Sequence, residues 1–196
     1  MNEVNHRGWH NRGYLPHLDA GEAWQFITFR LADSLPRGVV ESWKAELEED
    51  GNRDRKLLEK VDDYLDRGHG SCVLKRPEIS EYVENSFRHF DGDRYELSAW
   101  VVMPNHVHVL VKTTIEFPVG KVVGSWKMHT TRQINARLGE HGRLWQPDYF
   151  DRFIRNEQHF LRVVNYIEGN PVSAGLVGAP EDWRFSSACA RKNGTP

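Results

Sequence analysis

The strongest constraint on the fold is a central stretch with the pattern of two strands joined by a tight turn. Residues 95–103 and 106–111 are rich in aromatic and β-branched side chains, which favour extended backbone. Pro104 and Asn105 stand between the two runs, and both residue types favour tight turns. The pattern predicts an antiparallel hairpin at the centre of the chain.

The segments around this hairpin show further strand and helix patterns. Residues 24–31 alternate between two faces, which predicts a strand. Apolar positions three and four residues apart predict helices, and these fall in residues 39–66, 77–90, 119–138 and 157–170. The first of these stretches is expected to form two helices separated near Asp50-Gly51-Asn52, and Pro171 is expected to end the last helix. This order favours an α+β fold of the ferredoxin-like kind, an antiparallel sheet with helices on one face and the other face open.

Length, composition and charge predict one main domain. The 196 residues are 39% hydrophobic and carry a net charge of -2, which is typical of a single globular unit. We expect residues 1–22 to form an arm, 23–188 the domain with an acidic helical insertion at about 41–75, and 189–196 a tail. Residues 41–67 include ten acidic and six basic residues, whereas 121–166 include eight basic and four acidic ones. The second region is therefore able to bind an anion despite the near-neutral total, although both regions are equally compatible with ordinary solvated faces.

No segment predicts export or membrane insertion. No run approaches the roughly 18 apolar residues that a membrane span needs, and residues 1–18 lack the apolar core of a secretory signal. Cys72 and Cys189 form no CxxC pair, so neither a disulfide framework nor a cysteine zinc site is indicated. We expect a cytoplasmic protein without membrane contact.

His106 and His108 lie in the second strand of the predicted hairpin. Residues two apart on a strand point to the same face, so the two imidazoles, roughly 6–7 Å apart along the strand, are able to converge on one divalent metal. The chain contains ten histidines, and the spacing alone is also compatible with two solvated side chains.

Tyr166 lies off the apolar stripe of the 157–170 helix. Helical spacing places it on a face with His159, Arg162 and Asn170. A phenol with a pKa near 10 is a poor nucleophile unless a neighbouring charge or metal assists it, and the Asn170 amide offers an oxygen that a hard metal ion accepts. Taken alone, the segment is also compatible with a half-exposed tyrosine near a helix end.

Three separate stretches together resemble the single-tyrosine HUH transposases, in particular the branch of REP-associated tyrosine transposases. They read AWVVMPNHVHVLVK (99–112), LWQPDYFDRFIRNEQHF (144–160) and NYIEGNPVSAGLV (165–177). The opening RGYLPHLDAGEAWQFITFRLADSLP (12–36) is similar to that branch as well. The resemblance extends over about residues 12–188, with the motifs in order.

The resemblance implies an enzyme that cleaves and rejoins single-stranded DNA beside hairpin-forming sequences through a covalent 5′-phosphotyrosine. It implies His106 and His108 as the histidine pair that binds a divalent metal, Asn170 as the third ligand and Tyr166 as the nucleophile. Mg²⁺ or Mn²⁺ is the implied cofactor, and an amide oxygen with two imidazoles lets Mn²⁺ compete well. The acidic stretch at 41–75 and the near-neutral charge depart from the family pattern.

Substrate contacts are expected from aromatic and basic side chains. Trp24 and Phe26 would project from the open sheet face, where rings stack on unpaired bases. Basic side chains are expected to follow the phosphates, namely Arg30, Lys121, Lys127, Arg132, Arg152, Arg155 and Arg162. Burial of the two rings, and plain solvation of most of the basic residues, are the competing interpretations. The expected partner is single-stranded or hairpin DNA, bound by a monomer or a homodimer.

Two other functions stay open at this point. A non-catalytic module would bind structured nucleic acid through the sheet, and its DNA affinity would survive a chelator. An unrelated metallohydrolase would use the histidine pair to activate water, and Tyr166 would then be dispensable.

Overall fold

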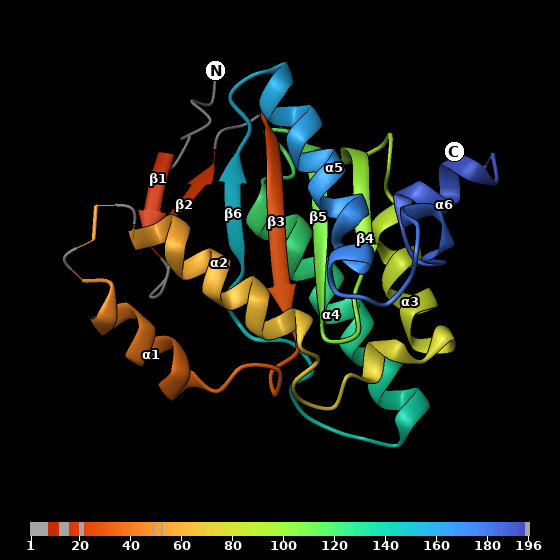
Figure 1. Ribbon diagram of the computed structural model, residues 1–196. Helices are drawn as coiled ribbons and strands as arrows, with labels where there is room; N and C mark the ends of the chain where they lie inside the picture. The colour runs from red at the N-terminus through yellow and green to blue at the C-terminus, as the bar shows by residue number, and fades with distance from the viewer. Residues whose placement is uncertain (1–7, 12–15, 20–21, 49, 52, 195–196) are drawn as a thin grey trace.

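A four-stranded antiparallel sheet forms the centre of the computed structural model, which describes residues 8–11, 16–19, 22–48, 50–51 and 53–194. Its strands lie in the order β4 (Tyr95–Val102), β5 (His106–Thr113), β3 (Trp24–Arg30) and β6 (Phe150–Phe153). Every neighbouring pair is antiparallel. Helices connect β3 to β4 and β5 to β6 (Figure 1), which is the connectivity of a ferredoxin-like fold. The predicted α+β class is confirmed.

The predicted hairpin is formed by β4 and β5. The Met103 N–H donates to the His106 carbonyl at 2.9 Å, which closes the turn through Pro104 and Asn105. Because β5 lies between β4 and β3, nearly all of its residues are buried. The two histidines of β5 are therefore at the middle of the sheet.

Helices α3 (Pro77–Arg88) and α4 (Val119–Leu138) cover one face of the sheet (Figure 1). Alternate residues of β3 and β5 point into this layer, among them Ile27, Phe29, Val107, Val109 and Val111. They pack with helix residues that include Ile79, Val83, Phe87, Val122, Val123 and Trp126. Each such side chain contributes about 1.5–3 kcal/mol on burial, so this layer is the main core, and the valines of β5 face the helices as predicted.

The opposite face is covered too, so the expectation of an open face is wrong. Helix α5 (Glu157–Ser173) packs on β4 and β5, and α2 (Arg53–Asp66) lies on the same side, in front of β3 and β6 (Figure 1). A second core joins sheet residues Phe26, Ala99, Val101, Met103 and Leu110 to Ile154, Val163 and Ile167. The physical reason is that the apolar stripe of α5 and the apolar side chains on this face both need burial, and each covers the other.

The acidic insertion consists of two helices, as predicted. Helix α1 (Arg37–Glu46) and α2 are separated at residues 47–52, and Leu47, Leu57 and Leu65 are buried. Lys60 forms an ion pair with Glu46 at 2.8 Å. These contacts make the insertion a packed part of the domain.

The remaining elements are short. They are the two-stranded sheet of β1 (Gly8–Asn11) and β2 (Pro16–Asp19), the 3₁₀ turns at Val73–Lys75 and Pro180–Asp182, and α6 (Ser187–Lys192). The described part of the expected arm thus forms a strand pair, and the expected tail begins inside α6, whose Ala190 is buried. Both cysteines are free thiols. Within the described ranges, none of the helices has the length and apolar character to cross a membrane.

Two local predictions differ from the structure. Strand β6 lies in a stretch containing proline and tryptophan for which no strand was predicted. Helix α5 continues past Pro171 to Ser173, because a proline in the last turn removes only one N–H while the Ala174 N–H still donates to the Asn170 carbonyl at 2.9 Å. Asn170 is consequently held in regular helix.

Candidate active site

His106 and His108 lie on β5 beneath the second helical layer. Both side chains are fully buried, and their Nε2 atoms are 3.1 Å apart. Two nitrogen ligands about 2.1 Å from one metal ion, at right angles to each other, would be about 3.0 Å apart. The pair therefore has the separation that shared coordination of one cation requires.

The Nδ1 atoms of both histidines have hydrogen-bond partners. His106 Nδ1 is 2.8 Å from Asn105 Oδ1, and His108 Nδ1 is 2.7 Å from Thr28 Oγ1. Because an amide oxygen only accepts hydrogen bonds, the His106 Nδ1 carries the proton. Its Nε2 then keeps the lone pair that a metal ion needs.

Burial determines the charge of the pair. It lowers the pKa of His106 to about 3. Burial, together with the neighbouring His106, also lowers the pKa of His108 well below its usual range. Both imidazoles are therefore neutral near pH 7, which is the form that coordinates cations.

The Asn105 side chain links the histidine strand to α2 through hydrogen bonds. This side chain is fully buried, and its Nδ2 donates to the carbonyls of Leu65 at 3.0 Å and His69 at 2.9 Å. The same side chain accepts from His106. One amide thus joins α2, the segment after it and the proposed metal ligand.

We expect Asn105→Ala to lower the free energy of unfolding by about 2–4 kcal/mol, because it leaves two carbonyls and the His106 N–H without partners. It should also weaken Mn²⁺ binding about 10–100-fold, because the His106 ring loses its orientation. Chemical denaturation and Mn²⁺ titration measure the two effects. Asn193→Ala, at the exposed end of α6, is the matched control, and unchanged Mn²⁺ affinity in Asn105→Ala would contradict the prediction.

Tyr166 reaches the histidines from α5 of the same chain. Its ring centroid is 5.4 Å from that of His108 and 5.8 Å from that of Phe26. The side chain is 40% exposed, so its ring packs on the sheet while part of it contacts solvent. The phenol and the imidazole pair border the same space.

The Tyr166 hydroxyl donates a hydrogen bond to Asp62 Oδ2 of α2 at 2.7 Å. Burial and the negative charge of Asp62 raise the pKa of Tyr166. Burial also raises the pKa of Asp62 to about 7, against the opposing effect of the Tyr166 hydrogen bond. The acidic insertion therefore contacts the phenol directly.

Two buried oxygens, one on α5 and one on α2, have no hydrogen-bond partner among the described residues. Asn170, one turn after Tyr166 on α5, is 3% exposed, and its Oδ1 is unpartnered. Asp66 Oδ1 is unpartnered as well and lies 3.8 Å from His106 Nε2. Burial, assisted by Asp63, raises the pKa of Asp66 to about 6. Buried oxygens without partners call for a ligand or an ion.

These donors fit a divalent cation. The part of the chain that the structure describes has no group of three or more His, Cys, Asp or Glu side chains placed to hold a metal, so the imidazole pair needs an oxygen of another type. Asn170 Oδ1, buried and without a partner, is an oxygen of that type. Two imidazoles with an amide oxygen suit Mn²⁺ or Mg²⁺.

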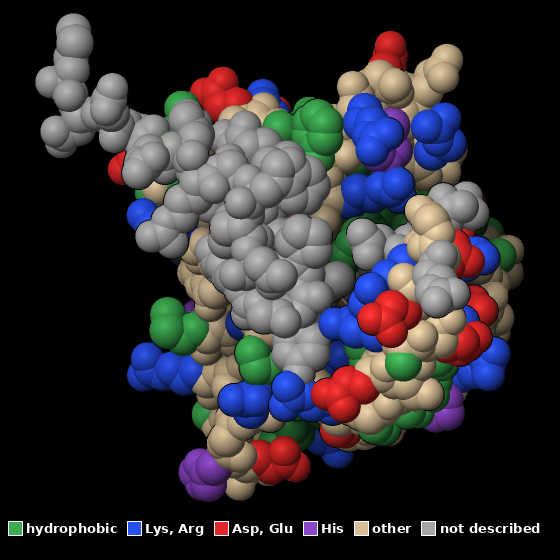
Figure 2. Space-filling model, turned by 90° about the vertical axis from the view of Figure 1, so that its left-hand side faces the viewer, with side chains coloured by type: hydrophobic (Ala, Val, Ile, Leu, Met, Phe, Trp, Pro, Cys, Tyr) green, Lys and Arg blue, Asp and Glu red, His purple; other side chains and the backbone are tan. Residues whose placement is uncertain are grey.

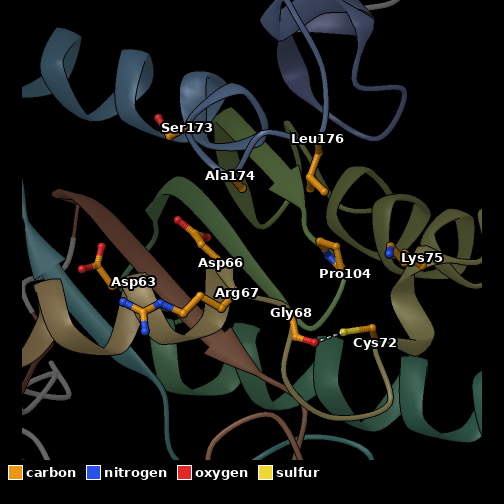
Figure 3. Close-up of a pocket in the computed structure, with 10 residues that line it drawn as sticks. All are labelled: Asp63, Asp66, Arg67, Gly68, Cys72, Lys75, Pro104, Ser173, Ala174 and Leu176. Carbon is orange, nitrogen blue, oxygen red and sulfur yellow. Dashed lines mark hydrogen bonds between the residues drawn. The ribbon is translucent and has the colours of Figure 1, made fainter.

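A pocket of about 620 Å³ opens between the ends of α2 and α5 (Figure 3). Asp66 and Pro104 line it, together with the basic residues Arg67 and Lys75. Pro104 belongs to the turn that precedes His106, so the pocket adjoins the histidine strand. Figure 3 shows Arg67 and Lys75 on opposite sides of this opening.

Of the two rings predicted to stack on bases, Phe26 is buried and Trp24 is half-buried, and both pack against other parts of the protein. The Trp24 ring meets Phe160 of α5 edge-on at 5.2 Å. Phe26 is 7% exposed and stacks on His108 at 5.4 Å. The prediction fails because α5 occupies the face where bases were expected to stack, and Phe26 supports His108 and Tyr166.

Three of the predicted phosphate contacts form a basic group near the start of α5. Arg152, Arg155 and Arg162 are exposed, and all three lower the pKa of His159, after the larger effect of burial. Arg162 lies one turn before Tyr166 on α5. Figure 2 shows Lys and Arg side chains grouped beside a histidine at one end of the molecule. These exposed positive charges therefore lie at the end of the molecule where α5, the helix that carries Tyr166, begins.

Lys121, Lys127 and Arg132 lie on α4, in the layer behind the sheet and away from α5 (Figure 1). Lys127 has an internal role, which corrects its prediction as a phosphate contact. Its Nζ donates to the three carbonyls of residues 146–148, so all three of its donors are used. Lys121 and Arg132 are exposed but face away from the histidine pair.

Arg30 ends β3 directly opposite His106 in the β5 register. Residues opposite each other in an antiparallel pair point to the same face, so the Arg30 side chain leaves the strand on the histidine face, while its guanidinium interacts electrostatically with Asp148 and Lys127. Its Nη1 is buried without a hydrogen-bond partner among the described residues. An unused buried guanidinium donor suits a phosphate.

Four side chains of the site, those of Asp62, Asp66, Thr28 and Asn105, were not predicted from the sequence. The acidic character of the insertion was the one signal, and Asp62 and Asp66 are one helical turn apart on α2. Nothing in the local pattern shows that this helix would lie on Tyr166.

The sequence model of the family described as Transposase IS200 like matches residues 72–170, about half of the chain. The chain belongs to the IS200-like transposase family. The matched segment contains His106, His108, Tyr166 and Asn170, whereas α2 lies outside it.

Individual relatives agree with this membership. The REP-associated tyrosine transposase of Escherichia coli (strain K12) is 32% identical over 93 residues, which are 47% of this chain and 54% of that relative. This IS200-like chain thus matches about half the length of the curated relative. A solved structure described as the REP associates tyrosine transposase bound to a REP hairpin covers 95% of this chain and 87% of its own, with a TM-score of 0.51 and 20% identity. That likeness concerns the fold.

Proposed function

We propose that this chain is a metal-dependent enzyme that cleaves and rejoins single-stranded DNA beside hairpin-forming sequences, through a covalent 5′-phosphotyrosine at Tyr166. One observation carries the proposal: the Tyr166 ring lies 5.4 Å from His108 within one chain. A phenol nucleophile and two neutral metal-type ligands therefore adjoin the same space. Membership of the IS200-like transposase family supports DNA strand transfer as the reaction.

His106, His108 and Asn170 would hold Mg²⁺ or Mn²⁺. When bound, the cation would supply Lewis-acid polarisation of the scissile phosphate and offset its charge. Thr28 and Asn105 orient the imidazoles through their Nδ1 atoms.

Tyr166 Oη attacks the phosphorus, the P–O3′ bond breaks, and the DNA 5′ phosphate stays on the tyrosine. The Phe26 ring restricts the phenol and so reduces the entropy lost on reaching the attack position. Because a phosphodiester is exchanged for a phosphotyrosyl ester, a 3′ hydroxyl can later reverse the step and join strands. The contact within one chain favours use of Tyr166 on its own histidine pair, in a monomer or in each subunit of a homodimer.

The DNA path in this proposal passes from the basic group at the start of α5 to the pocket at its end. Arg152, Arg155 and Arg162 would bind phosphates at one side, and Arg67 and Lys75 would do so at the other. A hairpin is the expected structured partner, because the solved neighbour of the same fold is described as bound to a REP hairpin. A cytoplasmic location is part of the proposal, since the substrate is cellular DNA.

The test is a labelling experiment with single-stranded DNA that contains a hairpin and its flanks. With Mn²⁺, wild type should yield a covalent protein–DNA species on a denaturing gel when the DNA is labelled at its 3′ end. DNA labelled at its 5′ end should give only a shortened free strand, because tyrosine keeps the 5′ phosphate of the downstream fragment. A chelator should abolish both products.

A non-catalytic binding module gives a different result. Hairpin DNA would be retained on a native gel with or without chelator, and neither label would enter a covalent species across a broad set of substrates. That outcome would overturn the proposed function.

A further inference from the structure

Asp62 is the partner of the proposed nucleophile. Its Oδ2 accepts a hydrogen bond from the Tyr166 hydroxyl, with 2.7 Å between the two oxygens. An ionised carboxylate only accepts hydrogen bonds, so the phenol proton points at Asp62 and a lone pair of Oη is free to turn elsewhere. This is the geometry of a nucleophile beside a base.

Packing and hydrogen bonding hold helix α2 in place beside the site. Leu57 and Leu65 are 6% and 1% exposed, so buried side chains hold the middle and the C-terminal end of the helix against the protein. Asn105 binds the Leu65 carbonyl while it also holds His106. The carboxylate of Asp62 is therefore positioned relative to the histidine strand by the same side chain that orients the imidazole.

The surroundings of Asp62 suit a proton acceptor that works near neutral pH. Asp63 and Asp66 on its own helix and Tyr166 on α5 are the groups that influence it. Burial raises the pKa of Asp62 to about 7, and a base is most effective when its pKa lies near the working pH. The hydrogen-bond geometry stands independently of this shift.

We propose that Asp62 is a catalytic residue, the general base that takes the Tyr166 proton during DNA cleavage and returns it during rejoining. The inference rests on the proposed function. As the Oη–P bond forms and the P–O3′ bond breaks, the phenol proton passes to the Asp62 carboxylate, and the departing 3′ oxygen takes a proton from water. Asp62 then releases its proton to solvent, so no proton is gained or lost overall. In rejoining, the same events run backwards.

The base would come from a part of the chain that the family match does not include. The match covers residues 72–170, whereas Asp62 lies on α2 (Arg53–Asp66) of the acidic insertion. The insertion that departs from the family pattern thus contributes to the chemistry.

The test compares single-turnover cleavage by wild type, Asp62→Asn, Glu59→Gln and Tyr166→Phe under saturating DNA and Mn²⁺. Asn keeps the size and an acceptor oxygen but cannot take the proton, so we expect the cleavage rate to fall about 10²-fold or more. Glu59→Gln makes the same charge change at an exposed position of α2 and should cleave like wild type. In Asp62→Asn and in Glu59→Gln, hairpin binding on a native gel and thermal stability should match those of the wild type.

The possible outcomes separate the two proposals. Cleavage by Asp62→Asn at or above the wild-type rate would overturn the inference alone, since the carboxylate would then be idle or inhibitory. If Asp62→Asn cleaves slowly but also loses hairpin affinity or thermal stability in proportion to its lost rate, Asp62 has a structural role. That result would overturn the inference as well. If wild type gives no more covalent species than Tyr166→Phe, the proposed function itself fails.

Discussion

Tyr166→Phe is expected to remove the covalent protein–DNA species completely, a loss of at least about three orders of magnitude in cleavage rate. Phenylalanine keeps the ring contacts with Phe26 and His108 and lacks only the hydroxyl that attacks phosphorus. The substitution also removes the hydrogen bond to Asp62. A denaturing gel with DNA labelled at its 3′ end measures the effect.

Controls for Tyr166→Phe separate strand transfer from hydrolysis. The variant should bind hairpin DNA and unfold at nearly the wild-type temperature, because the rest of the site is unchanged. In an unrelated metallohydrolase, the metal site would activate water, and Tyr166→Phe would still cut the DNA. Undiminished cleavage by this variant would therefore contradict the tyrosine mechanism.

His106→Ala is expected to weaken Mn²⁺ binding by at least about 10²-fold, because the site loses one of its two nitrogen ligands. The expectation follows from the 3.1 Å separation of the two Nε2 atoms and from the neutral state that burial imposes on His106. Isothermal titration calorimetry, or the electron paramagnetic resonance signal of free Mn²⁺, measures the affinity without DNA. Cleavage should fall in parallel.

A matched control tells ligand loss from unfolding. His89→Ala removes an exposed imidazole near the end of α3, on the far side of the sheet, and should leave Mn²⁺ binding unchanged. Because His106 is fully buried, His106→Gln, which fills most of the space, is measured beside it together with thermal stability. Wild-type Mn²⁺ affinity in a folded His106 variant would show that the metal binds elsewhere.

The elements that were predicted correctly are those whose signal lies within a short stretch of chain. The β4–β5 hairpin follows from two β-branched runs around Pro104 and Asn105, and α4 follows from apolar residues at helical spacing. Strand periodicity also placed Val107 and Val109 in the main core and put His106 and His108 on the other face. Local backbone preference and side-chain alternation are enough for these conclusions.

The predictions that failed depend on which distant segment covers a surface. Trp24 and Phe26 were expected to be open to bases, yet α5 packs on both rings. Lys127 was expected to contact phosphates, yet the carbonyls of residues 146–148 occupy it. Strand β6 has only four residues. Its backbone is extended because it pairs with β3, and its own amino-acid composition carries no strand signal.

By itself, the sequence determined which side chains share a face: the two histidines on one strand, and Tyr166 and Asn170 on one helix. The family resemblance implied their roles. Only the tertiary structure decided that α2 and α5 close over the histidine face and that Asp62 meets Tyr166 across 104 positions of the chain. The physical reason is that periodicity reports how each element is oriented about its own axis, whereas the choice of docking partner depends on burying complementary apolar surfaces far apart in sequence.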